Sequence, residues 1–239
     1  MLNRFAILLF ACAISFAPQS YAQSPHENAK VEADAVNAFI NDLAAKNGIY
    51  MSIRRIEFFS ELAKGQQPFA TVVTCSDSRV QTNMFSRAPE GKLFMIRNIG
   101  NQLTTAEGSV EYGVHHLHSP VLMFVGHSRC GAIAAVSGNY SKESEAIRRE
   151  LDTINISSNL NNMDGVQANV HNQVSAAMIK FGEEIRKGEL VVIGAVMDFA
   201  DDLHSGAGKL HIINVNGESD RNKLGNVKAL LSVKHLRTH

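Results

Sequence analysis

The stretch FATVVTCSDSR, residues 69–79, decides the fold. Its first half is short, apolar and rich in β-branched residues, which is typical of a buried strand that delivers Cys75 at its carboxyl end. A second buried strand, residues 121–125, leads in the same way into Gly126-His127. Further predicted strands cover residues 93–96, 190–196 and 210–215.

Helical patterns alternate with these strands. The predicted helices cover residues 24–46, 51–63, 104–117 and 165–187, with one more opening at Cys130. This alternation predicts an α/β fold, with a mostly parallel central sheet flanked by helices and an N-terminal helical arm. Sites in such sheets form outside the carboxyl ends of strands, so the two strand ends should meet there.

Residues 1–22 have the pattern of a secretory signal peptide. Arg4 precedes an apolar run, residues 5–17, and small residues lead to a predicted cleavage after Ala22. We therefore expect residues 23–239 to form the mature domain, in the periplasm or secreted. One alternative is a membrane anchor, but a span needs about 20 apolar residues and the run of residues 5–17 is shorter. The other alternative is a lipoprotein signal that ends at Cys12.

Composition limits the class of partner. The 239 residues are 45% hydrophobic, which is enough for one globular core. Lys and Arg total 23, as do Asp and Glu, so the formal net charge is zero. This balance gives no attraction to nucleic acid or to an anionic membrane, and we expect neither as a partner once the signal is removed.

The two strand ends carry a donor set for a transition metal. Cys75, Asp77, His127 and Cys130 offer two thiols, an imidazole and a carboxylate, which suit zinc. Residues i and i+2 of an extended segment face the same side, so Cys75 and Asp77 can point at one ion. Cys130 follows His127 by three residues at a strand-to-helix turn, where the helix N-terminus favours a thiolate.

Arg79 makes this pattern typical of a catalytic site. Zn²⁺ with two thiolates and a neutral imidazole carries no net charge, and Asp77 as fourth ligand would close the site. If Arg79 holds Asp77 instead, the fourth position opens to water, whose pKa zinc lowers to near 7. Two thiolates donate more charge than imidazoles do, so activity should rise into the alkaline range.

Two other interpretations of the same residues are open. One is a closed structural zinc site, which would have no need of Arg79. The other is a Cys75–Cys130 disulfide, because these are the only cysteines left once Cys12 departs with the signal. A nearby histidine group could ferry protons, bind adventitious metal, or simply be exposed on a helix; it comprises His115, His116 and His118.

The segments CSDSRV, residues 75–80, and GHSRCG, residues 126–131, resemble the signature pair of the β-class carbonic anhydrases. The resemblance extends over roughly residues 65–215. It includes Gly65-Gln66, FMIRNIGN at 94–101, Glu111-Tyr112, and an N-V-x-x-Q-V-like helix at 166–174. It implies the β-carbonic anhydrase fold and reversible hydration of CO2 to bicarbonate and a proton, by attack of zinc-bound hydroxide, with one Zn²⁺ per subunit.

The resemblance also implies roles for individual residues. The zinc ligands would be Cys75, His127 and Cys130, with Asp77 as a switchable fourth ligand that forms the catalytic dyad with Arg79. Substrate-binding residues would be Gln66, Phe94, Ile99, Tyr112 and Gly131. The family's site lies at a dimer interface, so the chain should form a dimer or tetramer, with some groups supplied by the neighbour and the N-terminal helix lying over it.

A bacterial, exported and plant-like subtype is implied as well. Members with a regulatory bicarbonate site have a Trp just before the first ligand motif, whereas this chain has no Trp and carries Val72 there. We therefore expect an open metal site with Asp77 on Arg79. Departures from the family pattern occur at Gln81, at Ala132 and over residues 199–207. CS2 and COS are alternative substrates on the same scaffold.

Overall fold

A computed structural model of the chain describes residues 32–224. The predicted signal peptide, residues 1–22, therefore lies outside the described residues. The chain divides into two compact units, Met1–Arg55 and Ile56–His239. No helix within the described part of the chain is both long and apolar enough to cross a membrane.

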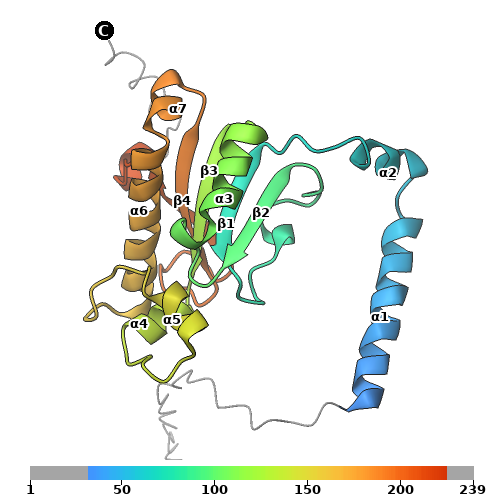
Figure 1. Cartoon of the computed structure of the whole chain (residues 1–239), viewed down its shortest axis with the longest axis horizontal. Helices are drawn as coiled ribbons and strands as arrows, with labels where there is room; N and C mark the ends of the chain where they lie inside the picture. The colour runs from blue at the N-terminus through green and yellow to red at the C-terminus, as the bar shows by residue number, and fades with distance from the viewer. Residues whose placement is uncertain (1–31, 225–239) are drawn as a thin grey trace, which may run out of the picture. The chain divides into compact units, whose positions relative to one another are not determined.

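The described part of the first unit is one helix, α1, Ala33–Ser52 (Figure 1). It runs beyond the predicted end at residue 46, through Gly48. None of its residues is buried within the chain, and Phe39, Ile40 and Leu43 are 63%, 54% and 52% exposed. Most of a helix's stability in proteins comes from packing an apolar face, so α1 lacks that support within its own unit.

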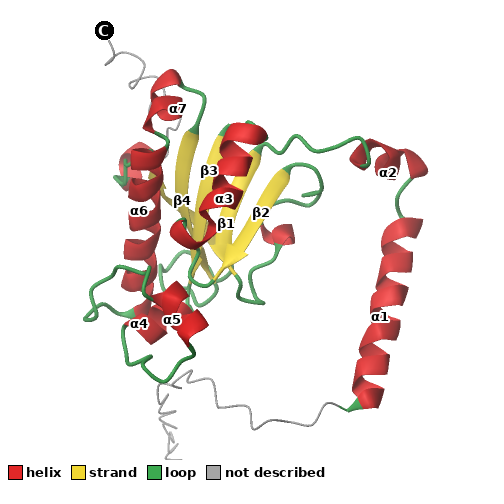
Figure 2. Cartoon of the chain, in the orientation of Figure 1, coloured by secondary structure: helices red, strands yellow, loops and turns green. Residues whose placement is uncertain are grey.

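The second unit is built on a five-stranded sheet in the order β2-β1-β3-β4-β5. Figure 2 shows the first four of these strands side by side. Neighbours among the first four strands are parallel, and β5 runs antiparallel to β4. This confirms the mostly parallel α/β sheet expected from the sequence. The strands are β1 Ala70–Cys75, β2 Leu93–Asn98, β3 Val121–His127, β4 Val191–Asp198 and β5 Lys209–Val215.

The helices of this unit are shorter than the sequence patterns predicted. They are α2 Ile56–Leu62, α3 Glu107–Glu111, α4 Gly131–Val136, α5 Glu145–Leu151, α6 Asn162–Lys180, α7 Gly182–Lys187 and α8 Arg221–Leu224. The single helix predicted over 165–187 is two helices, because Phe181 leaves the helical conformation at φ −112° and ψ 30° and is fully buried. The helix predicted over 104–117 is a 3₁₀ turn at Thr104–Ala106, then α3, then a π-helical turn at Tyr112–His116.

The main core lies between the sheet and the helices α3 and α6, which cover the same face (Figure 2). Phe124 of β3 and Phe181 after α6 are its largest fully buried side chains. Towards the carboxyl ends of the strands a second cluster continues under α4 and α5, and this cluster contains both Cys75 and Cys130. The two cysteines are therefore part of the packed interior.

Two glycines let α6 approach the sheet closely. A Cβ atom on Gly126 of β3 would lie 2.7 Å from Val166 Cγ1 and 2.9 Å from Val170 Cγ2. On Gly194 of β4 it would lie 2.7 Å from Val170 Cγ1. Distances this short require the valine side chains of α6, or the helix itself, to shift. Gly126 immediately precedes His127, so the packing of α6 also sets the position of the end of β3.

We predict that Gly126→Ala destabilises the protein by about 1–3 kcal/mol through overpacking against α6. The measurement is urea unfolding followed by circular dichroism. Gly182→Ala is the matched control, because a Cβ atom there has no neighbour within 4 Å. That change should be neutral or stabilising by up to about 1 kcal/mol. Equal stability of the two variants would contradict this account of α6 packing.

Candidate metal centre

The parallel register brings the two sequence motifs to one place. Thr74 of β1 lies beside Val125 of β3, so both strands finish at the same edge of the sheet. Cys75 is the last residue of β1, His127 ends β3, and Cys130 directly precedes α4. The donor atoms of Cys75, His127 and Cys130 all lie within 4.8 Å of one another. Within residues 32–224 no other group of three His, Cys, Asp or Glu donors converges in this way.

His127 presents one ring nitrogen to this group. Its side chain is fully buried, and Nδ1 donates to the carbonyl of Ser128 at 3.0 Å. Because a carbonyl can only accept, this bond places the proton on Nδ1 and leaves Nε2 as an acceptor. Nε2 is buried and has no hydrogen-bond partner in the structure. A buried acceptor without a partner, beside two thiols, fits a bound metal ion.

The two cysteines are buried and unpaired by any disulfide. The pKa of Cys75 is lowered from 9.0 to about 4, chiefly because the Cys130 thiol donates a hydrogen bond to its sulfur. That same bond raises the pKa of Cys130, and burial adds to the rise. The metal-free pair therefore keeps one shared proton near neutral pH. A metal ion that binds both sulfurs must displace this proton, so metal affinity falls as the pH falls.

Cys130 is held by its backbone as well as by its sulfur. The Asn162 side chain, at the start of α6, accepts from Cys130 N and donates to Cys130 O, each at 3.1 Å. The backbone N–H groups of Ala132 and Ile133, in the first turn of α4, donate to the Cys130 sulfur. The sequence predicted the thiolate-stabilising helix end but gave no signal for Asn162.

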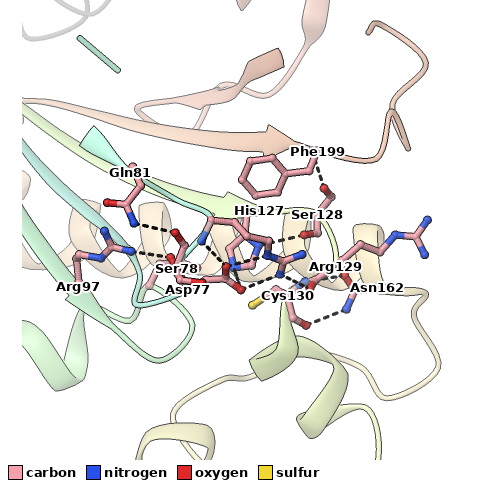
Figure 3. A network of polar contacts seen from close by, with 12 residues as sticks. Asp77, Ser78, Gln81, Arg97, His127, Ser128, Arg129, Cys130, Asn162 and Phe199 are labelled. Carbon is pink, nitrogen blue, oxygen red and sulfur yellow. Dashed lines mark hydrogen bonds and ion pairs between the residues drawn. The ribbon is translucent and has the colours of Figure 1, made fainter. Parts of the chain in front are cut away.

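Asp77 is held by Arg79. Figure 3 shows Asp77 beside two of the metal donors, His127 and Cys130. Arg79 Nε donates to Asp77 Oδ1 at 2.8 Å, Arg79 Nη2 donates to Oδ2 at 2.7 Å, and the Arg79 backbone N–H adds a third bond at 2.9 Å. Asp77 Oδ2 lies 3.7 Å from His127 Nε2. The carboxylate is therefore near the metal donors while both of its oxygens are engaged by the guanidinium.

Both partners of this ion pair are themselves anchored, and Figure 3 shows the contact between Arg97 and Asp77. Arg79 Nη2 also donates to the carbonyl of Arg129 at 3.0 Å, and Arg97 Nη2 donates to the carbonyl of Asp77 at 2.6 Å. Arg97 comes from the FMIRNIGN segment, which the sequence singled out without giving this residue a role. The anchors tie the β1, β2 and β3 strand ends together around Asp77.

The ion pair persists over the whole physiological pH range. The Arg79 hydrogen bond is the largest cause that lowers the pKa of Asp77 from 3.8 to about 2, and partial burial opposes it. Because the folded pKa is depressed, the pair's stabilisation is fully present above the unfolded pKa of 3.8. It is lost only as the pH falls through about 2.

The loop after β4 forms a rim over the ion pair. The Phe199 ring centroid lies 5.7 Å from the Arg79 guanidinium carbon and 6.1 Å from the His127 ring. Ser128 Oγ accepts from Phe199 N at 2.7 Å, and buried Asp198 accepts from the N–H of Leu203 at 2.8 Å. The segment that departs from the family pattern, residues 199–207, thus begins at the site. The sequence singled out this segment but gave Phe199 itself no role, because no motif marks it.

The remaining predicted residues fall into two groups. Ile99 packs on the core cluster that contains Cys75 and Cys130, and Gly131 directly follows Cys130. Phe94 and Tyr112 contact each other, with ring centroids 5.8 Å apart, but Phe94 pairs with Thr71 and so lies four residues before the level of Cys75. Gln66 is exposed in the loop that enters β1, at the opposite end from Cys75. The roles predicted for Gln66, Phe94 and Tyr112 stay predictions that need a second copy of the chain.

We predict that Cys75→Ser lowers zinc affinity by at least about 100-fold, because a hydroxyl replaces a thiolate donor. The measurement is zinc content after dialysis against a weak chelator, with circular dichroism to confirm folding. Ser78→Ala, a change at an exposed position of the same motif, should retain zinc like the parent chain. Full zinc retention by Cys75→Ser would contradict the assignment of this metal centre.

Comparison with known proteins gives one consistent result. The family model described as carbonic anhydrase matches residues 70–204, which is more than half of the chain. A carbonic anhydrase of Synechococcus elongatus is 39% identical over 84 residues, covering 32% of this chain and 31% of that protein. "Carbonic anhydrase 2" of Mycobacterium tuberculosis is 29% identical over 160 residues, covering 59% of this chain and 74% of that protein.

Solved structures resemble the fold as well. A tetrameric β-carbonic anhydrase from the filamentous ascomycete Sordaria macrospora matches with a TM-score of 0.62 and 25% identity, over 74% of this chain and 98% of that one. The β-carbonic anhydrase CcaA matches with a TM-score of 0.64 and 22% identity, over 76% of this chain and 88% of that one. The residues that the family model matches, 70–204, include the strands β1 to β4 and both metal-donor motifs.

Proposed function

The chain belongs to the β-class carbonic anhydrase family, and we propose on this premise that it catalyses the reversible hydration of CO2 to bicarbonate and a proton. The observation that carries the proposal is the partnerless Nε2 atom of buried His127, which lies beside two free thiols while Arg79 holds the neighbouring carboxylate. A closed structural site would instead use Asp77 as its fourth donor. The arrangement favours a metal with an open coordination position.

The three donors fit zinc, the metal of this family. Two sulfurs and one imidazole nitrogen form a common zinc ligand set, so Cys75, His127 and Cys130 would hold the ion. When bound, zinc supplies a Lewis acid that lowers the pKa of a coordinated water towards neutrality. The Nδ1–H bond from His127 to Ser128 O fixes the ring orientation that this coordination requires.

Asp77 acts in this proposal as a proton-selective acceptor. Its pKa of about 2 keeps it ionised at neutral pH, so its oxygens accept hydrogen bonds and donate none. An oxygen that still carries a proton is therefore favoured beside Asp77, and one without a proton is repelled. Arg79 holds Asp77 in place, and the carbonyl of Arg129 limits the movement of Arg79. Arg79 thereby keeps the carboxylate off the metal.

The apolar surroundings suit an uncharged, linear substrate. Ile99 and the core cluster that contains Cys75 and Cys130 supply apolar contacts on one side of the donors, and Phe199 lies on the rim. Gly131, at the first residue of α4, has no side chain to block its N–H, and a Cβ atom there would have no neighbour within 4 Å. Apolar surroundings of this kind suit CO2 and do not by themselves reject CS2 or COS.

Self-association completes the site in this proposal. Tyr112 is 44% exposed and contacts Phe94, and α1 exposes apolar side chains along its length. Exposed apolar groups in this number are typical of an interface with another copy. The Sordaria macrospora relatives are described as tetrameric. A dimer or tetramer would place Gln66, Phe94 and Tyr112 of one subunit at the metal centre of its neighbour.

We predict that the zinc-loaded protein hydrates CO2 in a stopped-flow assay and that Arg79→Ala and Asp77→Asn each lower turnover by about 100-fold while retaining zinc. Arg149→Ala is the matched control, because it removes a surface Arg–Glu pair on α5, with Arg149 Nη1 2.9 Å from Glu145 Oε1. This control should keep parental turnover.

Three outcomes of this assay are informative. Zinc-loaded protein without CO2 hydration would contradict the proposed function. If the zinc-loaded protein hydrolyses CS2 or COS but does not hydrate CO2, the sulfur compound is its substrate. Full activity of Arg79→Ala would leave the reaction in place but remove the role assigned to the ion pair.

We also propose that the chain is exported, on the basis of the sequence pattern of residues 1–22. Expression of the full chain in a Gram-negative bacterial host should yield a periplasmic protein that begins at Gln23, as read by N-terminal sequencing. Ala22→Lys should block cleavage and raise the mass by the signal segment, because signal peptidase requires a small residue at this position. A cytoplasmic product that begins at Met1 would contradict the proposal.

A further inference from the structure

A cluster of buried, uncharged amide side chains surrounds the carbonyl of Gly100, close to the metal donors. Gln102 follows β2, whereas Asn169 and Gln173 come from α6, and their exposed fractions are 1%, 1% and 6%. Two of these amides donate to the same backbone atom, the carbonyl oxygen of Gly100. The distances are 2.9 Å from Asn169 Nδ2 and 2.6 Å from Gln102 Nε2. The reaction as described above assigns no role to these residues.

Each amide in this cluster is held by the others. Asn169 Oδ1 accepts from Gln102 Nε2 at 2.8 Å, and Gln102 Oε1 accepts from Gln173 Nε2 at 2.9 Å. Gln173 Oε1 in turn accepts from the backbone N–H of Leu103 at 2.8 Å. A buried network with its polar atoms satisfied in this way is rigid. The carbonyl of Gly100 is therefore fixed relative to α6.

Gly100 connects this amide cluster to the metal donors, because its C=O accepts from the amides and its N–H faces Cys75. Its φ of +76° is a conformation that favours glycine, and a Cβ atom there would lie 2.7 Å from Ile154 Cδ1. On the other side of its Cα atom, the Gly100 N–H donates a hydrogen bond to the Cys75 sulfur. With φ of Gly100 at +76°, fixing its carbonyl also restrains the direction of its N–H.

We propose that Asn169 is a positioning residue for the metal centre, which acts with Gln102 to hold Gly100 so that its N–H donates to the metal-binding sulfur of Cys75. The inference rests on the proposed function, in which Cys75 binds zinc. An N–H donor withdraws electron density from a thiolate, so the bound metal retains more positive charge and remains a stronger Lewis acid. The network thereby offsets part of the charge that two thiolates donate.

The test compares two asparagines of α6. Asn169→Ala removes one of the two amide donors to Gly100 O. Asn172→Ala is the matched control, because Asn172 Nδ2 also donates to a backbone carbonyl at an exposed position, but that carbonyl is the one of Asn155 and not of Gly100. Zinc affinity is measured by competition with a chromophoric chelator. The thiolate-to-metal charge-transfer band is recorded after loading with Co²⁺ alone.

Asn169→Ala should bind zinc about 10-fold more weakly than the parent chain, because Cys75 is then less firmly oriented and this loss outweighs the gain in donor strength of its sulfur. Its cobalt charge-transfer band should move to lower energy, because a thiolate without its hydrogen bond is more easily oxidised. Asn172→Ala should match the parent chain in both measurements. If metal affinity and band position are unchanged in Asn169→Ala, the inference is overturned, whether or not the variant loses stability.

A measurement on the parent chain guards against failure of Asn169→Ala to fold. After substitution with ¹¹³Cd, a scalar coupling between the metal and the Gly100 amide proton should be detected by NMR, because such couplings pass through an N–H···S bond. Absence of this coupling in a cadmium-loaded protein would overturn the inference and leave the proposed function intact. Failure of the parent chain to bind any of these metals would instead contradict the proposed function.

Discussion

The parallel pairing of β1 with β3 is the constraint on which the rest of the site depends. Because Thr74 lies beside Val125, one register fixes where two segments about fifty residues apart deliver their donors. A shift of one residue would turn Cys75 to the other face of the sheet. The small residues Gly126 and Gly194 let α6 lock this register from one side, and α6 also supplies the side chains that fix Cys130 and Gly100.

Charge balance decides what these donors can do. Asp77 is close enough to the group to compete for a metal, yet a guanidinium holds both of its oxygens, and a backbone carbonyl holds that guanidinium. A carboxylate with a pKa of about 2 has little tendency to take a proton and leave its partner at neutral pH. The geometry therefore separates the three metal donors from the acceptor beside them, although all four groups lie on two adjacent strand ends.

Much of this arrangement could be predicted from the sequence, because strand ends in a parallel sheet meet at one edge and motifs such as CSDSR and HSRC mark those ends. The strands, the sheet class and the donor trio follow from local patterns. The break at Phe181 could not be predicted, since a buried aromatic overrides continuous helical periodicity only in the packed fold. Asn162 and the Gly100 contact were missed, and Phe199 was given no role of its own, because these groups act across long sequence separations, through backbone atoms or a partly buried ring that carry no motif.

The amide cluster of Asn169, Gln102 and Gln173 contains no group that can gain or lose a proton in water. The support behind Cys75 is thus the same in mild acid as in mild base, and ionic strength has little effect on it, because uncharged groups are not screened by salt. Changes of acidity act on the metal centre through its titratable groups, among them Asp77 and the two buried thiols. A titration of the metal centre therefore reports on Asp77 and the thiols and not on the amide cluster that supports them.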